Sequence, residues 1–187
     1  MKCYVFPVRN GVAYWGVKSL LNPYNGAAAW CAGFPSVFGG NDDDDNTYVT
    51  CAKETTEESH RKIELDPAVF QLLWTTKVGF THYIYYYARG FNFSPNAVLS
   101  LAQAAMPSYQ EGTGDVLLLD MNNAPVPDLN NLAPLINWIL QEFRLQFPHP
   151  GAGDPINNAV ARQQFNTSEH IKAFARLVTQ HQANPII

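Results

Sequence analysis

The sequence predicts an α/β (α+β) chain with a central sheet and several helices. Three observations support this class. Two β-rich runs flank an Asn-Gly pair near the start, a run of aromatic and β-branched residues occupies the middle, and two later stretches carry apolar residues at helical spacing. Strand patterns and helix patterns thus occur in separate parts of the chain, which is typical of the α+β class.

The first element predicted is a hairpin over residues 2–18. The runs 3–8 and 12–17 are rich in β-forming residues, and Asn10 and Gly11 between them form a favoured two-residue turn. A loop containing Pro23 and Gly26 follows it.

Residues 80–88, FTHYIYYYA, predict a strand of the central sheet because aromatic and β-branched residues favour strands. Alternation puts Tyr83 and Tyr85 on one face and His82 and Tyr86 on the other. One face is expected to pack in the core. Tyr83 and Tyr85 are candidates for stacking on the base or sugar of a nucleotide, and packing is the alternative role for tyrosines on a strand.

Shorter elements are predicted between these landmarks. Asp66 and Pro67 favour a short helix through Leu73. Ser94 is a good N-cap for a helix that carries Val98, Leu101, Ala102 and Ala105 in register. Residues 111–115, with glycines at 112 and 114, predict a turn, and residues 116–119 predict a buried strand.

The strongest helical pattern covers residues 132–143, with apolar side chains forming one broad stripe. Residues 148–155 resemble a linker, and a last amphipathic helix is expected over 168–181. We therefore expect a main domain over 1–150 and a C-terminal helical extension over 151–187 packed on it. The apolar stripe of the last helix must be covered, either by this domain or by a partner such as a second copy in a homodimer.

Composition excludes several classes of protein. The net charge is −4 and no basic stripe is present, so a general nucleic-acid-binding role is not expected. The three cysteines are scattered, which fits neither a disulfide framework nor a CxxC metal site. Because no leader-like apolar region or membrane-spanning run is found, a soluble cytoplasmic protein is expected.

The best candidates for a functional site are acidic residues between Gly39 and His60. On a helix, Glu54, Glu57 and Glu58 occupy positions i, i+3 and i+4 and share one face. Carboxylates this close repel one another, and a hard cation such as Mg²⁺ or Mn²⁺ would relieve that repulsion. The alternative is an exposed acidic face that needs no metal.

This segment resembles the Nudix box, G-x5-E-x7-R-E-U-x-E-E-x-G-U, where U is a bulky apolar residue. Counted from Gly39, both spacers fit without a gap and all three glutamates of the box helix are present. Five positions depart from the pattern: Asp45 replaces glutamate, Lys53 replaces arginine, Thr55 replaces an apolar residue, His60 replaces glycine, and Arg61 replaces an apolar residue.

The resemblance implies a mixed sheet sandwiched between helices. It also implies a metal-dependent hydrolase that cleaves a phosphoanhydride bond in a nucleoside diphosphate linked to another moiety. Glu54, Glu57 and Glu58 would be catalytic and would hold Mg²⁺ or Mn²⁺ together with Gly39. Asp45 and Lys53 would brace the loop against the helix, and the partner would be a nucleotide-type small molecule.

Two other interpretations remain open. The departures at Lys53, Thr55 and His60 fit a catalytically impaired Nudix-like module that binds nucleotides or other proteins. A structural domain whose terminal helix mediates assembly is the third.

Overall fold

The structure, a computed structural model, describes residues 1–42, 46–149 and 152–187. The strands are β1 (Lys2–Arg9), β2 (Val12–Lys18), β3 (Pro35–Ser36), β4 (Phe38–Asn41), β5 (Ile63–Glu64), β6 (Phe70–Val78), β7 (Thr81–Ala88), β8 (Asn92–Phe93) and β9 (Gly112–Asp120). The α-helices are α1 (Thr47–Glu58), α2 (Leu101–Ala104), α3 (Ala133–Gln146), α4 (Ala159–Asn166) and α5 (Glu169–Ala183).

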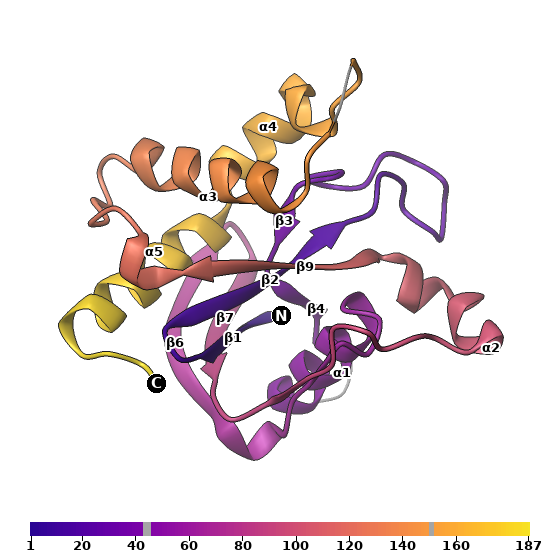
Figure 1. The fold of residues 1–187 in the computed structure, drawn as a ribbon, viewed down its shortest axis with the longest axis horizontal. Coiled ribbons are helices and arrows are strands. Elements are labelled where there is room, and N and C mark those ends of the chain that lie inside the picture. The colour runs from indigo at the N-terminus through magenta and orange to yellow at the C-terminus, as the bar shows by residue number, and fades with distance from the viewer. Residues whose placement is uncertain (43–45, 150–151) are drawn as a thin grey trace.

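Within the described residues, seven strands form one mixed sheet in the order β3-β2-β1-β7-β6, with β4 beside β1 and β9 beside β2. Strand β1 pairs parallel with β7 and antiparallel with β2 and β4. Figure 1 shows α1 on one side of the sheet and α3, α4 and α5 on the other. This arrangement confirms the α+β class and the mixed sheet sandwiched between helices.

In the part of the chain that the structure describes, the core forms two apolar clusters, one on each side of the sheet. Strand β7 contributes to both, as its alternation predicts: Tyr85 and Tyr87 belong to the cluster under α3 to α5, and Tyr86 and Ala88 to the cluster that includes α1 residues. Both faces of β7 are therefore packed from Tyr85 to Ala88.

The N-terminal hairpin is confirmed. Asn10 and Gly11 both have positive φ, 52° and 76°, as a type I′ turn requires. The pairing of β2 continues to β9, where Lys18 lies opposite Gly112. This register later decides which side chains meet at the end of α1.

The acidic helix expected to carry Glu54, Glu57 and Glu58 is also confirmed. Asn46 caps α1, because its side chain accepts hydrogen bonds from the backbone N–H groups of Tyr48 and Val49. Beyond the helix, His60 and Arg61 take positive φ values of 51° and 64°. The left-handed exit is thus made without glycine, and His60 Nε2 donates a hydrogen bond to the Gly112 carbonyl at 3.0 Å.

Two helix predictions were wrong. Asp66 caps only a 3-10 turn over Pro67–Val69, after which residues 70–78 enter the sheet as β6 because they pair with β7. The helix expected from Ser94 is reduced to α2, which starts later because Ser100 and Gln103 form a capping box. Val98 and Leu101 are 87% and 93% exposed, so this helix has no apolar face to bury.

The turn predicted over residues 111–115 was wrong as well. Gly112 to Asp115 are already part of β9, which pairs with β2 through a register shift between Gly16 and Lys18. Such a bulge accommodates glycines inside a strand.

The two long C-terminal stripes are confirmed as core faces. Leu135, Ile139 and Phe143 are buried in α3, and Phe174 and Leu177 in α5 are fully buried. Since the stripe of α5 packs against the sheet of its own chain, it offers no surface for a homodimer. Among the described residues, no helix combines the length and apolar character needed to cross a bilayer.

Glycine at position 39 is predicted to be essential for the fold. Its φ is +130°, and a Cβ there would lie 2.2 Å from the carbonyl oxygen of Cys3 on β1. Gly39→Ala should therefore lower the free energy of unfolding by about 3 kcal/mol or more, measured by urea denaturation. Gly26→Ala is the matched control, because Gly26 has φ +69° with no atom within 4 Å of an added Cβ. Equal losses in the two variants would contradict the role of the close approach.

Candidate functional site

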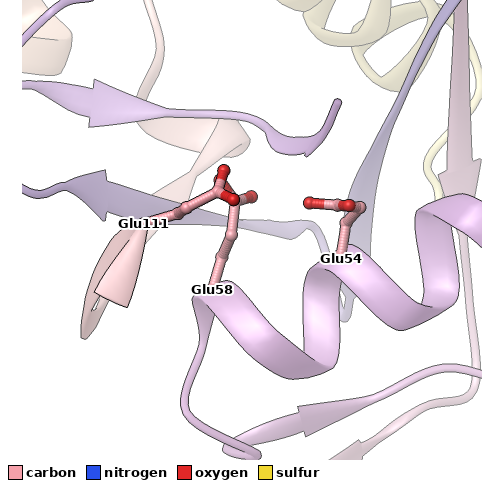
Figure 2. A group of neighbouring side chains, drawn as sticks. All are labelled: Glu54, Glu58 and Glu111. Atoms are coloured by element: carbon pink, nitrogen blue, oxygen red, sulfur yellow. The ribbon is translucent and has the colours of Figure 1, made fainter. Parts of the chain in front are cut away.

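Three carboxylates from two parts of the chain converge at the C-terminal half of α1. Glu54 and Glu58 come from the helix, and Glu111 immediately precedes β9. One oxygen from each lies within 4.8 Å of the other two. Figure 2 shows the three side chains pointing toward a common space.

Local structure explains this convergence. Glu54 and Glu58 are four residues apart and so share one helix face. The end of the β2–β9 pairing brings Glu111 to the helix, and both the backbone N–H and the hydroxyl of Ser19 donate to the Glu111 carbonyl, at 3.2 and 3.0 Å. A Cβ on Gly112 would lie 2.4 Å from the Glu58 carbonyl oxygen, so only glycine permits this approach.

Glu58 is the most constrained of the three acids, being only 4% exposed. Lys18 Nζ donates to its Oε1 at 2.5 Å, and the backbone N–H of Gly39 donates to its Oε2 at 3.1 Å. Burial acts to lower the pKa of Lys18, but the charge and hydrogen bond of Glu58 outweigh it, with help from Glu111 and Glu54, and the pKa is raised. Lys18 is therefore charged and ties β2 to α1.

Glu54 is strained electrostatically. Burial raises its pKa to about 8, and the charges of Glu58, Glu111 and Glu57 raise it in the same direction, against the opposing effect of Lys18. Glu54 therefore holds a proton at neutral pH when no metal ion is bound. In this cluster the acidic groups outnumber the one lysine that opposes them. Such clusters with shifted pKa values are typical of functional sites.

Glu54 and Glu111 line a cavity of about 460 Å³. Its lining combines acidic, basic and aromatic side chains, which are Lys2, Tyr4, Lys18, Tyr24, Trp30, Glu54, Glu111 and His170. Gly39 and Gly40 of β4 also line it, and a Cβ on Gly40 would lie 3.5 Å from the Glu54 carboxylate. Backbone of β4 thus runs directly beside the acidic cluster.

Glu57 lies outside the group of three, although its spacing predicts that it shares a helix face with Glu54 and Glu58. Burial raises its pKa, while the charge of Lys53 and a hydrogen bond with Ser108 oppose the rise. Lys53 is exposed on α1 and interacts electrostatically with Glu57. Asp45, the expected partner of Lys53, lies outside the described residues.

Tyr83 and Tyr85 were expected to contact a substrate, and the structure places neither at this cavity. Tyr85 is fully buried and its hydroxyl hydrogen-bonds to His170. Tyr83 lines a separate cavity beside Met1 and Thr76. The reason for Tyr85 is that both faces of β7 are covered from Tyr85 onward, whereas Tyr83 is half-buried in the earlier part of the strand. The aromatic residues of the cavity are Tyr4, Tyr24 and Trp30.

Sequence reasoning missed Glu111 and Lys18. Glu111 is 53 residues beyond Glu58, so no local spacing connects them. The available indication was an acid directly before a glycine at the start of a strand pattern, since a glycine in a strand often marks close backbone approach. Lys18 ends the predicted hairpin, and its side chain gave no indication of an acidic partner.

The chemistry of the cluster fits a hard divalent cation. Carboxylate oxygens are the preferred ligands of Mg²⁺ and Mn²⁺. In octahedral geometry with metal–oxygen distances of about 2.0–2.1 Å, neighbouring ligand oxygens lie about 3 Å apart. The observed oxygens lie within 4.8 Å of one another, so the side chains would have to move closer together to hold one ion. A metal ion at this cluster would either bind Glu58 together with Lys18 or replace Lys18 as the partner of Glu58.

No model of a protein family matches the sequence, and no curated protein matches it either. Solved structures with a similar fold include a MutT NUDIX hydrolase from Burkholderia pseudomallei, with 18% identity, TM-score 0.45, and coverage of 75% of this chain and 95% of that one. A mutT/nudix family protein from Listeria innocua shares 19% identity, with TM-score 0.37 and coverage of 77% and 94%. An ADP compounds hydrolase shares 9% identity, with TM-score 0.39 and coverage of 79% and 74%.

Likeness at such scores and identities does not establish an activity. The functional evidence is therefore the arrangement of this chain's own side chains.

The raised pKa of Glu54 predicts how stability depends on pH in the presence of EDTA. The folded-state pKa is about 8, against 4.5 for an ordinary glutamate. The stability associated with protonated Glu54 is fully present below the lower value and is lost as pH rises through the higher one. Glu54→Gln should therefore match the wild type near about pH 4 and exceed its unfolding free energy by on the order of 2 kcal/mol near about pH 9.

Urea denaturation across this pH range measures the effect. Glu64→Gln is the control, because Glu64 is an exposed carboxylate outside the cluster. Parallel pH profiles for wild type and Glu54→Gln would contradict the prediction.

Proposed function

We propose that this protein is a metal-dependent hydrolase of the Nudix type, which cleaves a phosphoanhydride bond in a nucleoside diphosphate linked to another moiety. The observation that carries the proposal is the convergence of Glu54, Glu58 and Glu111 within 4.8 Å. Two of these acids line a cavity that also holds two lysines and several aromatic side chains. A diphosphate with an attached ring system would use the acids to hold a metal ion, the lysines to bind phosphate oxygens and the aromatic side chains to contact the ring.

In this proposal Glu54, Glu58 and Glu111 hold Mg²⁺ or Mn²⁺, and Gly39 lies alongside. Glu57 assists from the same helix, with Lys53 supporting it. When bound, the ion neutralises phosphate charge and lowers the pKa of an attacking water.

The remaining contacts come from the chain itself. Lys2 and Lys18 line the cavity and are suited to binding phosphate oxygens. The aromatic side chains of the lining provide surfaces on which a base or another ring can stack. The same cavity can therefore bind the phosphates and the ring of one nucleotide.

Removal of one carboxylate should abolish activity. Glu54→Gln, Glu58→Gln and Glu111→Gln should each lower kcat/KM for ADP-ribose or NADH by more than the roughly 100-fold that loss of an outer-shell partner produces. Glu57→Gln tests the fourth acid. Release of nucleoside monophosphate is measured with Mg²⁺ and with Mn²⁺, and Glu64→Gln serves as the exposed control. Absence of hydrolysis by the wild type across a broad nucleotide panel would contradict the proposal.

One observation favours the second candidate, a nucleotide-binding module with impaired catalysis. Lys18 already neutralises Glu58 through a 2.5 Å ion pair, so part of the cluster is satisfied without metal. The Lys18 ammonium would then neutralise Glu58 in place of a metal ion.

A thermal-shift experiment separates the two candidates. For the hydrolase, Mn²⁺ alone should raise the Tm, and the shift should disappear in Glu54→Gln. For the binding module, ADP-ribose should raise the Tm equally with Mn²⁺ and with EDTA. A metal-independent shift of this kind would exclude the metal site as the basis of nucleotide binding.

A further inference from the structure

One polar side chain in the cavity has no role in the chemistry proposed above. His170, near the start of α5, lines the cavity although it is only 6% exposed. Tyr4 contacts its ring edge-on, with centroids 4.4 Å apart, and Trp30 does so at 5.5 Å. The imidazole is therefore fixed between two aromatic rings that line the same cavity.

The two ring nitrogens of His170 have different surroundings. Nδ1 lies 3.0 Å from the hydroxyl of Tyr85. Nε2 has no hydrogen-bond partner among the described residues. The buried side-chain atoms without a partner in this part of the chain are Trp15 Nε1 and Ser168 Oγ, so Nε2 of His170 is accessible. Since His170 lines the cavity, Nε2 is the atom that it offers to a ligand.

The hydrogen bond with Tyr85 decides what Nε2 can do. Burial, followed by the charges of Lys18 and Lys2, lowers the pKa of His170 to about 3, so the ring is neutral and carries one proton. Burial also raises the pKa of Tyr85, whose phenol therefore stays protonated. A phenol O–H is a stronger donor than the N–H of a neutral imidazole. Tyr85 thus donates to Nδ1, and the imidazole proton resides on Nε2.

We propose that Tyr4, Trp30 and His170 form a nucleobase subsite, in which the base contacts the Trp30 indole and accepts a hydrogen bond from His170 Nε2. Trp30 is 46% exposed, so part of its ring is free for stacking. The side chain of Tyr85 is a positioning residue that fixes the tautomer. This inference rests on the proposed function in taking the ligand to be a nucleotide.

Charge in the cavity supports a nucleotide over an uncharged aromatic compound. Lys2 and Lys18 are the charges that act on His170, and both line the cavity with it. A phosphate joined to the base through ribose would lie near these cations while the base contacts the aromatic residues. The acidic cluster of Glu54 and Glu111 lines the same cavity, where a second phosphate or its metal ion would lie.

The test is binding without metal, so that its result is independent of hydrolysis. Affinities of AMP, GMP, CMP and UMP are measured by calorimetry in EDTA for wild type, His170→Phe and Tyr85→Phe. His82→Phe is the matched control, because His82 is exposed on β7 and lines a different cavity. Ribose 5-phosphate, which lacks a base, is the matched ligand.

His170→Phe should weaken the best-bound nucleotide roughly 3- to 10-fold, as expected for one hydrogen bond, and leave ribose 5-phosphate unchanged. Tyr85→Phe should weaken the same nucleotide by a smaller factor. Nitrogen NMR of the wild-type imidazole should show the proton on Nε2, and Tyr85→Phe should mix the tautomers.

Three results would each overturn the subsite. They are no binding of any of the four nucleotides at millimolar concentration, equal loss of ribose 5-phosphate binding in His170→Phe, or a proton on Nδ1 in the wild type. Failure of hydrolysis with intact base-dependent binding would overturn only the proposed function.

Discussion

The site depends on how closely β9 passes the end of α1. Gly112 packs against the Glu58 carbonyl at a distance that no side chain would allow. The long β2–β9 pairing holds the strand in that position, with Lys18 opposite Gly112. As a result, Glu111 lies beside the helix acids although the three carboxylates repel one another. Backbone pairing and core burial thus stabilise an arrangement that side-chain electrostatics alone would oppose.

Two features reduce the electrostatic repulsion among the three acids. Glu58 is compensated by Lys18 and by the Gly39 N–H, which together engage both of its oxygens. Glu54 has no such hydrogen bonds in the described structure and keeps its proton, with a pKa of about 8. One acid is therefore ionised through pairing and its neighbour is neutral through burial. Neighbouring carboxylates with such different environments are typical of sites that bind a cation or transfer a proton.

Local patterns in the sequence predicted much of the fold and only part of the site. The Asn10-Gly11 hairpin, the acidic helix and the stripe from Leu135 to Phe143 depend on neighbouring residues and were correct. The helices expected at 67–73 and 94–105 failed because pairing with β7 and the capping box at Ser100 overrode the caps that suggested them. The proximity of Glu111 to Glu58 was not predicted, because it arises from strand pairing and not from local spacing.

The C-terminal residues belong to both the core and the cavity, which bears on how the chain is divided. Residues 151–187 were expected to form an extension packed on a domain ending at 150. Phe174 of α5 contacts Phe6 and Trp15 of the hairpin, with ring centroids 5.7 and 5.1 Å apart. His170, one turn earlier on the same helix, lines the cavity beside Tyr4. Because one helix supplies both contacts, the packing that buries Phe174 also fixes the depth at which His170 meets the cavity. The apolar cluster under α3 to α5 therefore contains residues from both sides of the linker predicted at 148–155.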